Sequence, residues 1–229
     1  MSARAQTASW EYSGASAPSP AHPAPVAGWI SSDEGLQAFA DEQVRGLVWR
    51  IFLGPAQPVT KHVLVSTMDQ KTDSSDLCEQ MGLTLARETV GTVLVVKAAD
   101  RSPAAGNAPS SVREASQRLA TNFWMMEGSC SGTLRLDRDT ANHREAFLQQ
   151  VRREFDYSIL QVTWSRLLSE AIRMGQASDG LILVLGAHGT RKAAAQQIHR
   201  TLTTAGVRLI GTVLSGRTFP VPESLYRIL

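Results

Sequence analysis

Five short apolar runs recur along the chain, and none shows the strict alternation of a half-exposed strand. They lie at residues 62–66 (HVLVS), 92–96 (TVLVV), 158–162 (SILQV), 181–185 (LILVL) and 209–214 (LIGTVL). Stretches with helical spacing of apolar residues separate them. Strands that are apolar on both faces and alternate with amphipathic helices are typical of a parallel sheet covered on both sides. The pattern predicts an α/β, doubly wound three-layer sandwich with a mostly parallel sheet.

The first helix is predicted from Asp33 to the Gly54-Pro55 pair, which ends it, and Ser31 or Ser32 can cap its start. Its expected buried face carries apolar residues at helical spacing: Leu36, Phe39, Ala40, Val44, Leu47, Val48 and Ile51. Further helices are predicted around residues 77–86, 141–154, 165–174 and 190–205, and a long loop over residues 101–111. Residues 1–32 are rich in Ala, Ser and Pro, so we expect a disordered tail before one domain at residues 33–229.

Charge and cysteine content exclude several functional classes. The formal net charge is +2 and the pI about 8.7, but the basic residues are scattered, so nucleic acid is not an expected partner. The two cysteines, Cys78 and Cys130, can form neither a metal cage nor a disulfide framework. The sequence has no secretory leader and no apolar run that could span a bilayer. We therefore expect a cytoplasmic protein, with attachment to the inner membrane through a partner left open.

Several segments, taken in order, match the pattern of one known family. The stretch DEQVRGLVWRIF matches a leading helix with an E-x-x-R-x-x-R motif, and TVLVVKAADRSP matches a strand that ends in D-x-D-x-R-x-P. REFDYSILQVTW matches a strand that ends in D-T-P-P. The chain over residues 34–229 thus resembles the cytoplasmic tyrosine-kinase domain of bacterial exopolysaccharide and capsule systems, a relative of the MinD and ParA ATPases. The resemblance implies a P-loop NTPase-like fold.

The segment that matches the phosphate loop departs from that family. A working loop needs glycines, a Lys for the phosphates and a Ser or Thr for magnesium. Here the loop contains no glycine, Ser74 stands where the Lys belongs, and Ser75 stands at the hydroxyl position. Lys71 comes three positions early, and Asp69 and Asp73 would repel a triphosphate. We therefore expect a vestigial loop and no bound ATP.

The positions that match the metal-binding carboxylates have changed as well. Lys97 and Ala99 replace the two aspartates after the second strand, and Asp100 lies one position out of register. Gln161 replaces the aspartate that holds the metal through water. Phosphoryl transfer depends on the metal and on these charges. The resemblance therefore implies neither a metal nor catalysis.

Other residues have a functional and a structural interpretation. Glu42 and Arg45 match the subunit-contact motif, although Val48 replaces its second Arg; otherwise they are a solvated helical pair. Trp49 and Phe52 are either a partner-facing anchor or core residues, and the core is favoured. Tyr226 is either a residual phosphoacceptor for a partner kinase or an ordinary tail residue.

Two further motifs carry little weight. Cys130 and Arg135 resemble a thiol-phosphatase loop, but the spacing is one residue short, so we reject it. His188 follows a strand near the expected ligand crevice, and we interpret it as a solvated turn residue.

The hypothesis that results is a catalytically degenerate, kinase-like regulator or scaffold. Its expected partner is a membrane polysaccharide copolymerase or an active kinase, and self-association is left open. The alternative is an active tyrosine autokinase or MinD-like ATPase that binds ATP and magnesium through a rebuilt loop, using Lys71 and Asp100. An unrelated Rossmann-type enzyme has little support, because no G-x-G-x-x-G follows a predicted strand.

Overall fold

The computed structural model describes residues 33–55, 59–68, 72–98, 110–128, 143–163, 168–187 and 192–215. The tail predicted over residues 1–32 lies outside these ranges, as do residues 101–109 of the loop predicted over residues 101–111.

Within them the strands form one sheet in the order β3-β4-β2-β5-β1-β6-β7. All neighbouring strands are parallel except β3, which runs antiparallel to β4. This confirms the mostly parallel sheet. The strands are β1 (His62–Thr67), β2 (Val93–Lys97), β3 (Gln117–Ala120), β4 (Phe123–Glu127), β5 (Tyr157–Thr163), β6 (Gly180–Gly186) and β7 (Leu209–Ser215).

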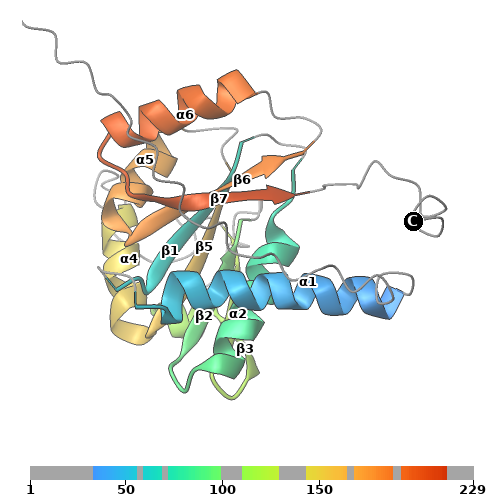
Figure 1. Cartoon of the computed structure of the whole chain (residues 1–229). Helices are drawn as coiled ribbons and strands as arrows, with labels where there is room; N and C mark the ends of the chain where they lie inside the picture. The colour runs from blue at the N-terminus through green and yellow to red at the C-terminus, as the bar shows by residue number, and fades with distance from the viewer. Residues whose placement is uncertain are drawn as a thin grey trace, which may run out of the picture.

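Helices cover both faces of the sheet, as the predicted three-layer sandwich requires (Figure 1). They are α1 (Asp33–Val48) with a π-helical turn η1 (Trp49–Leu53), α2 (Ser75–Glu88), α3 (Val112–Ala115), α4 (His143–Glu154), α5 (Leu168–Ala177) and α6 (Lys192–Thr204). Helices α1 and α2 pack on one face, and α3 to α6 on the other. Among the described residues, no helix combines the length and apolar character needed to cross a membrane.

Alternate residues of each central strand face opposite layers, which explains the continuous apolar runs. In β1, Val63 and Val65 pack with α1 and α2, whereas Leu64 packs with the helices on the other face. All three are fully buried. Both faces are therefore core, and polar side chains can reach solvent mainly at the ends of the strands.

Two glycines are needed for this packing. A Cβ on Gly82 of α2 would lie 2.2 Å from Val95 Cγ2 and 2.8 Å from Phe123 Cε2, so only glycine lets α2 approach β2 and β4 this closely. Gly206 follows α6 with φ of +74°, the left-handed conformation in which glycine commonly ends a helix. The helix ending near residue 205 is thus confirmed.

The segment at residues 110–128 contains α3, β3 and β4, none of which we predicted from the sequence. Strand β4 lies between β2 and the edge strand β3, and its Phe123 is fully buried in the core. Its sequence FWMME has no β-branched residue and no alternation, so the pattern that identified the other strands was absent.

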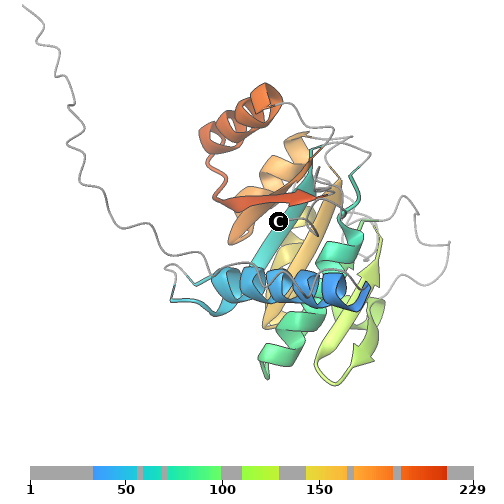
Figure 2. The same cartoon turned by 45° about the vertical axis from the view of Figure 1, so that its right-hand side comes forward.

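Helix α1 is less buried than its sequence predicts. Its apolar face enters the core only from Val44 onward, and Phe39 is 51% exposed. The N-terminal half of the helix extends beyond the strands in Figure 1, and Figure 2 shows α1 crossing α2, on which it packs. In η1, Phe52 is buried and packs edge-on against Tyr157, with 6.1 Å between ring centroids. The core position predicted for Trp49 is wrong, because that side chain is 54% exposed.

Candidate functional site

In this fold class, ligands bind beyond the carboxyl ends of the strands, where a strand passes into a helix. Strand β5 lies between β1 and β2. Its Gln161 pairs in register with Val65 of β1. The start of α2 and the residue after β2 meet at the same edge. This edge is where the sequence placed the vestigial phosphate and metal positions.

Gln161 connects these three elements through its side-chain amide. Its Nε2 donates to Ser74 Oγ at 3.0 Å, and its Oε1 accepts from the Ala98 backbone N–H at 3.1 Å. Ser75 Oγ lies 3.1 Å from Nε2 and 3.2 Å from Oε1, so it is bonded to the same amide. Gln161 is 6% exposed and Ser74 is 1% exposed. The residues at the expected Lys, hydroxyl and metal-carboxylate positions therefore bond to one another.

The Gln161 amide and the two serine hydroxyls carry no charge themselves, and the Asp73 carboxylate beside them also interacts with the Gln161 side chain. A carboxylate here could hold a metal, and a lysine could neutralise a phosphate, but an amide and two hydroxyls do neither. Buried polar groups that satisfy each other avoid the desolvation cost of unpaired ones. The arrangement joins α2, β2 and β5.

Asp73 supplies a negative charge at the start of α2. Its Oδ1 accepts the Ser75 backbone N–H at 2.8 Å. Hydrogen bonds from the backbone and side chain of Ser75 lower the pKa of the Asp73 carboxyl, so it is ionised at neutral pH. A helix N-terminus attracts anions, and in P-loop proteins that anion is a phosphate. In this chain the anion there is a side chain.

Lys97 at the end of β2 is also engaged. Its ammonium lies 2.5 Å from Glu79 Oε2 of α2, and this hydrogen bond raises the pKa of Lys97. The pair adds a second connection between α2 and β2. Among the described residues, no three His, Cys, Asp or Glu side chains are grouped in a way that could hold a metal ion.

Cys78 lies one turn into α2, and its backbone N–H donates to the Ser74 carbonyl at 2.9 Å. The side chain is fully buried, and burial raises the pKa of the thiol to about 12. A thiolate nucleophile at this edge is therefore not available from Cys78.

The structure places Glu42 and Arg45 on the exposed surface of α1. Their ion pair measures 3.1 Å, and Arg45 Nε lies 3.4 Å from Glu88 of α2. Glu88 is the last residue of α2, whereas the Gln161 network joins the first, so the two sets of sequence candidates do not form one site. Other candidates lie outside the described residues: Lys71, Ala99, Asp100, Cys130, Arg135, His188 and Tyr226.

A group of polar and charged residues at the opposite, amino edge of the sheet was not predicted from the sequence. It contains Lys61, His62, Arg152, Asp156 and Asp179. One signal was present: Asp156 and Asp179 each stand just before a buried strand, as FDYSILQV and SDGLILVL show. An acidic residue repeated at the starts of parallel strands falls at one edge of the sheet.

No protein-family model and no curated protein matches this sequence. Solved structures do match its fold. The VpsO kinase domain is 16% identical with a TM-score of 0.60, covering 81% of this chain and 98% of that one. The chimerical protein CapA2B2 is 12% identical with a TM-score of 0.60, over 76% and 83% of the two chains.

The kinase domain of the Escherichia coli tyrosine kinase ETK is 14% identical with a TM-score of 0.55, over 80% and 79% of the two chains. At these identities the likeness establishes the fold. This chain therefore has the α/β fold of bacterial tyrosine-kinase domains, as its sequence pattern suggested.

Proposed function

We propose that this chain is a kinase-like protein without phosphoryl-transfer activity that regulates or scaffolds exopolysaccharide biosynthesis or export through protein contacts. One observation carries the proposal: the Gln161 amide bonds to Ser74 and Ser75 at the edge where this fold binds phosphate and metal. The likeness to tyrosine-kinase domains supports the link to polysaccharide systems.

Phosphoryl transfer is mainly a matter of positioning and charge. A metal ion and a lysine neutralise the phosphates, and carboxylates hold the metal. In this chain Gln161 is uncharged, Lys97 is paired with Glu79, and Asp73 adds negative charge beside the helix start. These three features together oppose the binding of a magnesium–nucleotide complex.

Helix α1 is the surface that we assign to protein contacts. A groove of about 300 Å³ lies on it, and exposed Trp49 stands beside Gly46, where a Cβ would meet nothing within 4 Å. Glu42, Arg45 and Glu88 add charge of both signs to the rim. The expected partners are a membrane polysaccharide copolymerase, an active kinase or a second copy of the chain. Binding to a copolymerase would hold a cytoplasmic protein at the inner membrane.

Calorimetry with ATP and magnesium tests the absence of catalysis. We expect no binding up to about 1 mM nucleotide, a limit that corresponds to roughly 4 kcal/mol of binding free energy. An active tyrosine-kinase domain of the same fold is the positive control. Micromolar affinity, or phosphate transfer from labelled ATP to Tyr226, would contradict the proposal. It would support the alternative of an active autokinase or ATPase.

Binding to the purified cytoplasmic part of a polysaccharide copolymerase tests the contact surface. We expect Trp49→Ala to weaken binding by about tenfold or more, since exposed Trp side chains often dominate protein interfaces. The matched control is Leu119→Ala, which removes another exposed apolar side chain on the edge strand β3. Equal binding by both variants would argue against α1 as the contact surface.

A further inference from the structure

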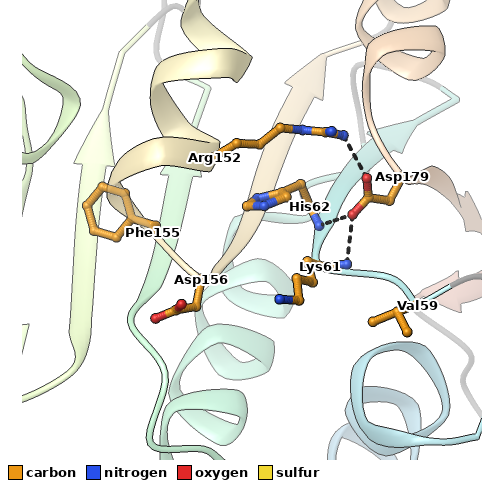
Figure 3. Close-up of a pocket in the computed structure, with 7 residues that line it drawn as sticks. All are labelled: Val59, Lys61, His62, Arg152, Phe155, Asp156 and Asp179. Carbon is orange, nitrogen blue, oxygen red and sulfur yellow. Dashed lines mark hydrogen bonds and ion pairs between the residues drawn. The ribbon is translucent and has the colours of Figure 1, made fainter.

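A cavity of about 370 Å³ opens at the amino edge of the sheet, opposite the Gln161 network (Figure 3). It lies among the starts of β1, β5 and β6 and the end of α4, and its polar lining is Lys61, His62, Arg152, Asp156 and Asp179. Its volume falls within the range of small-molecule sites. Some of these polar groups already form hydrogen bonds within the fold, and the others remain available to a ligand.

Asp179 is used. Its Oδ2 accepts the backbone N–H groups of Lys61 and His62, both at 2.8 Å. Its Oδ1 accepts from Arg152 at 2.6 Å. Three donors on one carboxylate connect the α5–β6 turn to β1 and α4, so Asp179 builds the cavity wall and has little capacity left for a ligand.

The Arg152 guanidinium uses only some of its N–H groups in hydrogen bonds within the fold. One terminal nitrogen, Nη2, donates to both Asp179 Oδ1 and the Ala177 carbonyl. The guanidinium has five N–H groups, and its Nε and Nη1 make no hydrogen bond to another described residue. Asp179 thus orients the guanidinium, while donors remain for a second acceptor.

Lys61 and Asp156 also keep unused capacity. No described carboxylate forms an ion pair with the Lys61 ammonium. Asp156 Oδ2 accepts from Thr92 N at 2.8 Å and Thr92 Oγ1 at 2.9 Å, which leaves Oδ1. His62 is 5% exposed, its Nδ1 bonds to Ser158 at 3.0 Å, and its ring lies between Arg152 and Lys61 in Figure 3. The unused groups are mostly cationic donors, with one acceptor at the rim.

We propose that this cavity binds a small hydroxylated carboxylic acid. The ligand carboxylate accepts from the Lys61 ammonium, the unused N–H groups of Arg152 donate to another ligand oxygen on the far side of His62, and a ligand hydroxyl donates to Asp156 Oδ1. Charge-assisted hydrogen bonds from Lys and Arg to a carboxylate are stronger than neutral ones. The Asp156 carboxylate disfavours a doubly charged phosphate but accepts a hydroxyl. Val59 and Phe155 supply the apolar wall.

Titration with D-glucuronate and D-glucose tests the proposal, because the two sugars differ by the carboxylate. Calorimetry and the shift in melting temperature are measured on the full chain. We expect glucuronate to bind and glucose to bind at least about tenfold more weakly, the usual effect of losing a hydrogen bond to a charged group. Inorganic phosphate is the third probe, and we expect it to bind more weakly than glucuronate.

Lys61→Met removes the ammonium but keeps the backbone N–H that bonds to Asp179. We expect about tenfold weaker glucuronate binding and an unchanged melting temperature without ligand. Lys192→Met, on exposed α6, is the matched control and should bind as the unaltered chain does. Equal binding of both sugars, tighter binding of phosphate, or no effect of Lys61→Met would overturn the proposal. None of these outcomes depends on whether the chain binds ATP.

Discussion

The two edges of the sheet handle polar groups in opposite ways. At the carboxyl edge, the Gln161 amide and two serine hydroxyls bond to one another, while the buried Ser66 Oγ at the end of β1 has no hydrogen-bond partner among the described residues. At the amino edge, Asp179 and Arg152 form an ion pair beside the buried imidazole of His62, and a cavity opens next to them. Among the described residues, side chains at the edge that usually binds ligands in this fold bond to one another, whereas the opposite edge has a cavity.

The difference predicts different energetics. A neutral hydrogen bond contributes about 1 kcal/mol net, so the carboxyl edge should tolerate single changes. Removing one member of a partly buried ion pair leaves the other charge unpaired, which costs more. Stability should therefore respond strongly to changes at the amino edge and weakly to changes at the carboxyl edge.

The largest effect is expected from Asp179→Ala. It leaves the Arg152 guanidinium and the backbone N–H groups of Lys61 and His62 without their acceptor. We expect the free energy of unfolding to fall by roughly 3 kcal/mol. Urea unfolding measures it, with exposed Glu127→Ala as the control. A loss as small as that of the control would remove the distinction between the two edges.

The next effect depends on pH. Burial lowers the pKa of His62 from its ordinary value of 6.5 to about 4. Between these values the unfolded chain binds a proton that the folded chain does not, so stability falls as the pH drops from 6.5 to 4. The loss attributable to His62 should approach roughly 3 kcal/mol.

Urea unfolding at several pH values between 6.5 and 4 checks this prediction. His62→Asn cannot take up a proton in that window, and its amide can still reach Ser158. We expect the variant to lose most of the pH dependence of unfolding. Hydrogen bonds from Thr92 lower the pKa of Asp156, so its protonation affects stability only below this range. An unaltered slope in the variant would show that His62 is not the group responsible.

Sequence pattern predicted the carboxyl edge better than the amino edge, for a physical reason. The position of Gln161 could be predicted because it lies near the end of an apolar run that resembles a known strand. Its hydrogen bonds to Ser74 and Ser75 could not be predicted from the sequence, since they depend on how α2 packs against β5. The amino edge joins Lys61, Asp156 and Asp179 from distant parts of the chain. The acidic residues before two strands indicate that they share an edge, but not that Asp179 bonds to Lys61 and Arg152.

The strands differ in the same way in how well the sequence predicts them. Continuous apolar runs identify strands that are buried on both faces, and β6 with its sequence LILVL is the clearest case. Strand β3 has the sequence QRLA and is exposed at all four residues, so it carries no periodic signal. Trp49 was assigned to the core although it does not share the helical spacing of Val44, Val48 and Ile51, and the structure buries Val48 and Ile51 but leaves Trp49 exposed.

A smaller effect is expected at the carboxyl edge from Gln161→Met, which keeps the shape but removes the amide. We expect a loss of about 1–2 kcal/mol, since Ser74 and the Ala98 N–H lose a partner. Gln197→Met on exposed α6 is the control. Unfolding in urea measures both variants. A loss as large as that of Asp179→Ala would show that the neutral network is as important as the charged one.

The smallest effect concerns Cys78, which probes how firmly the carboxyl edge stays closed. The thiol lies on the buried face of α2, and burial raises its pKa to about 12. It should therefore not react with a thiol reagent at pH 8 in the folded protein. A Cys130→Ser chain isolates it, because the sequence has only two cysteines. We expect Cys78 to react only at the rate of unfolding, and faster in the Gln161→Met variant in proportion to its lost stability. Rapid labelling of Cys78 in the chain that keeps Gln161 would mean that α2 separates from β5 without global unfolding. The Gln161 network would then open readily enough to admit a ligand.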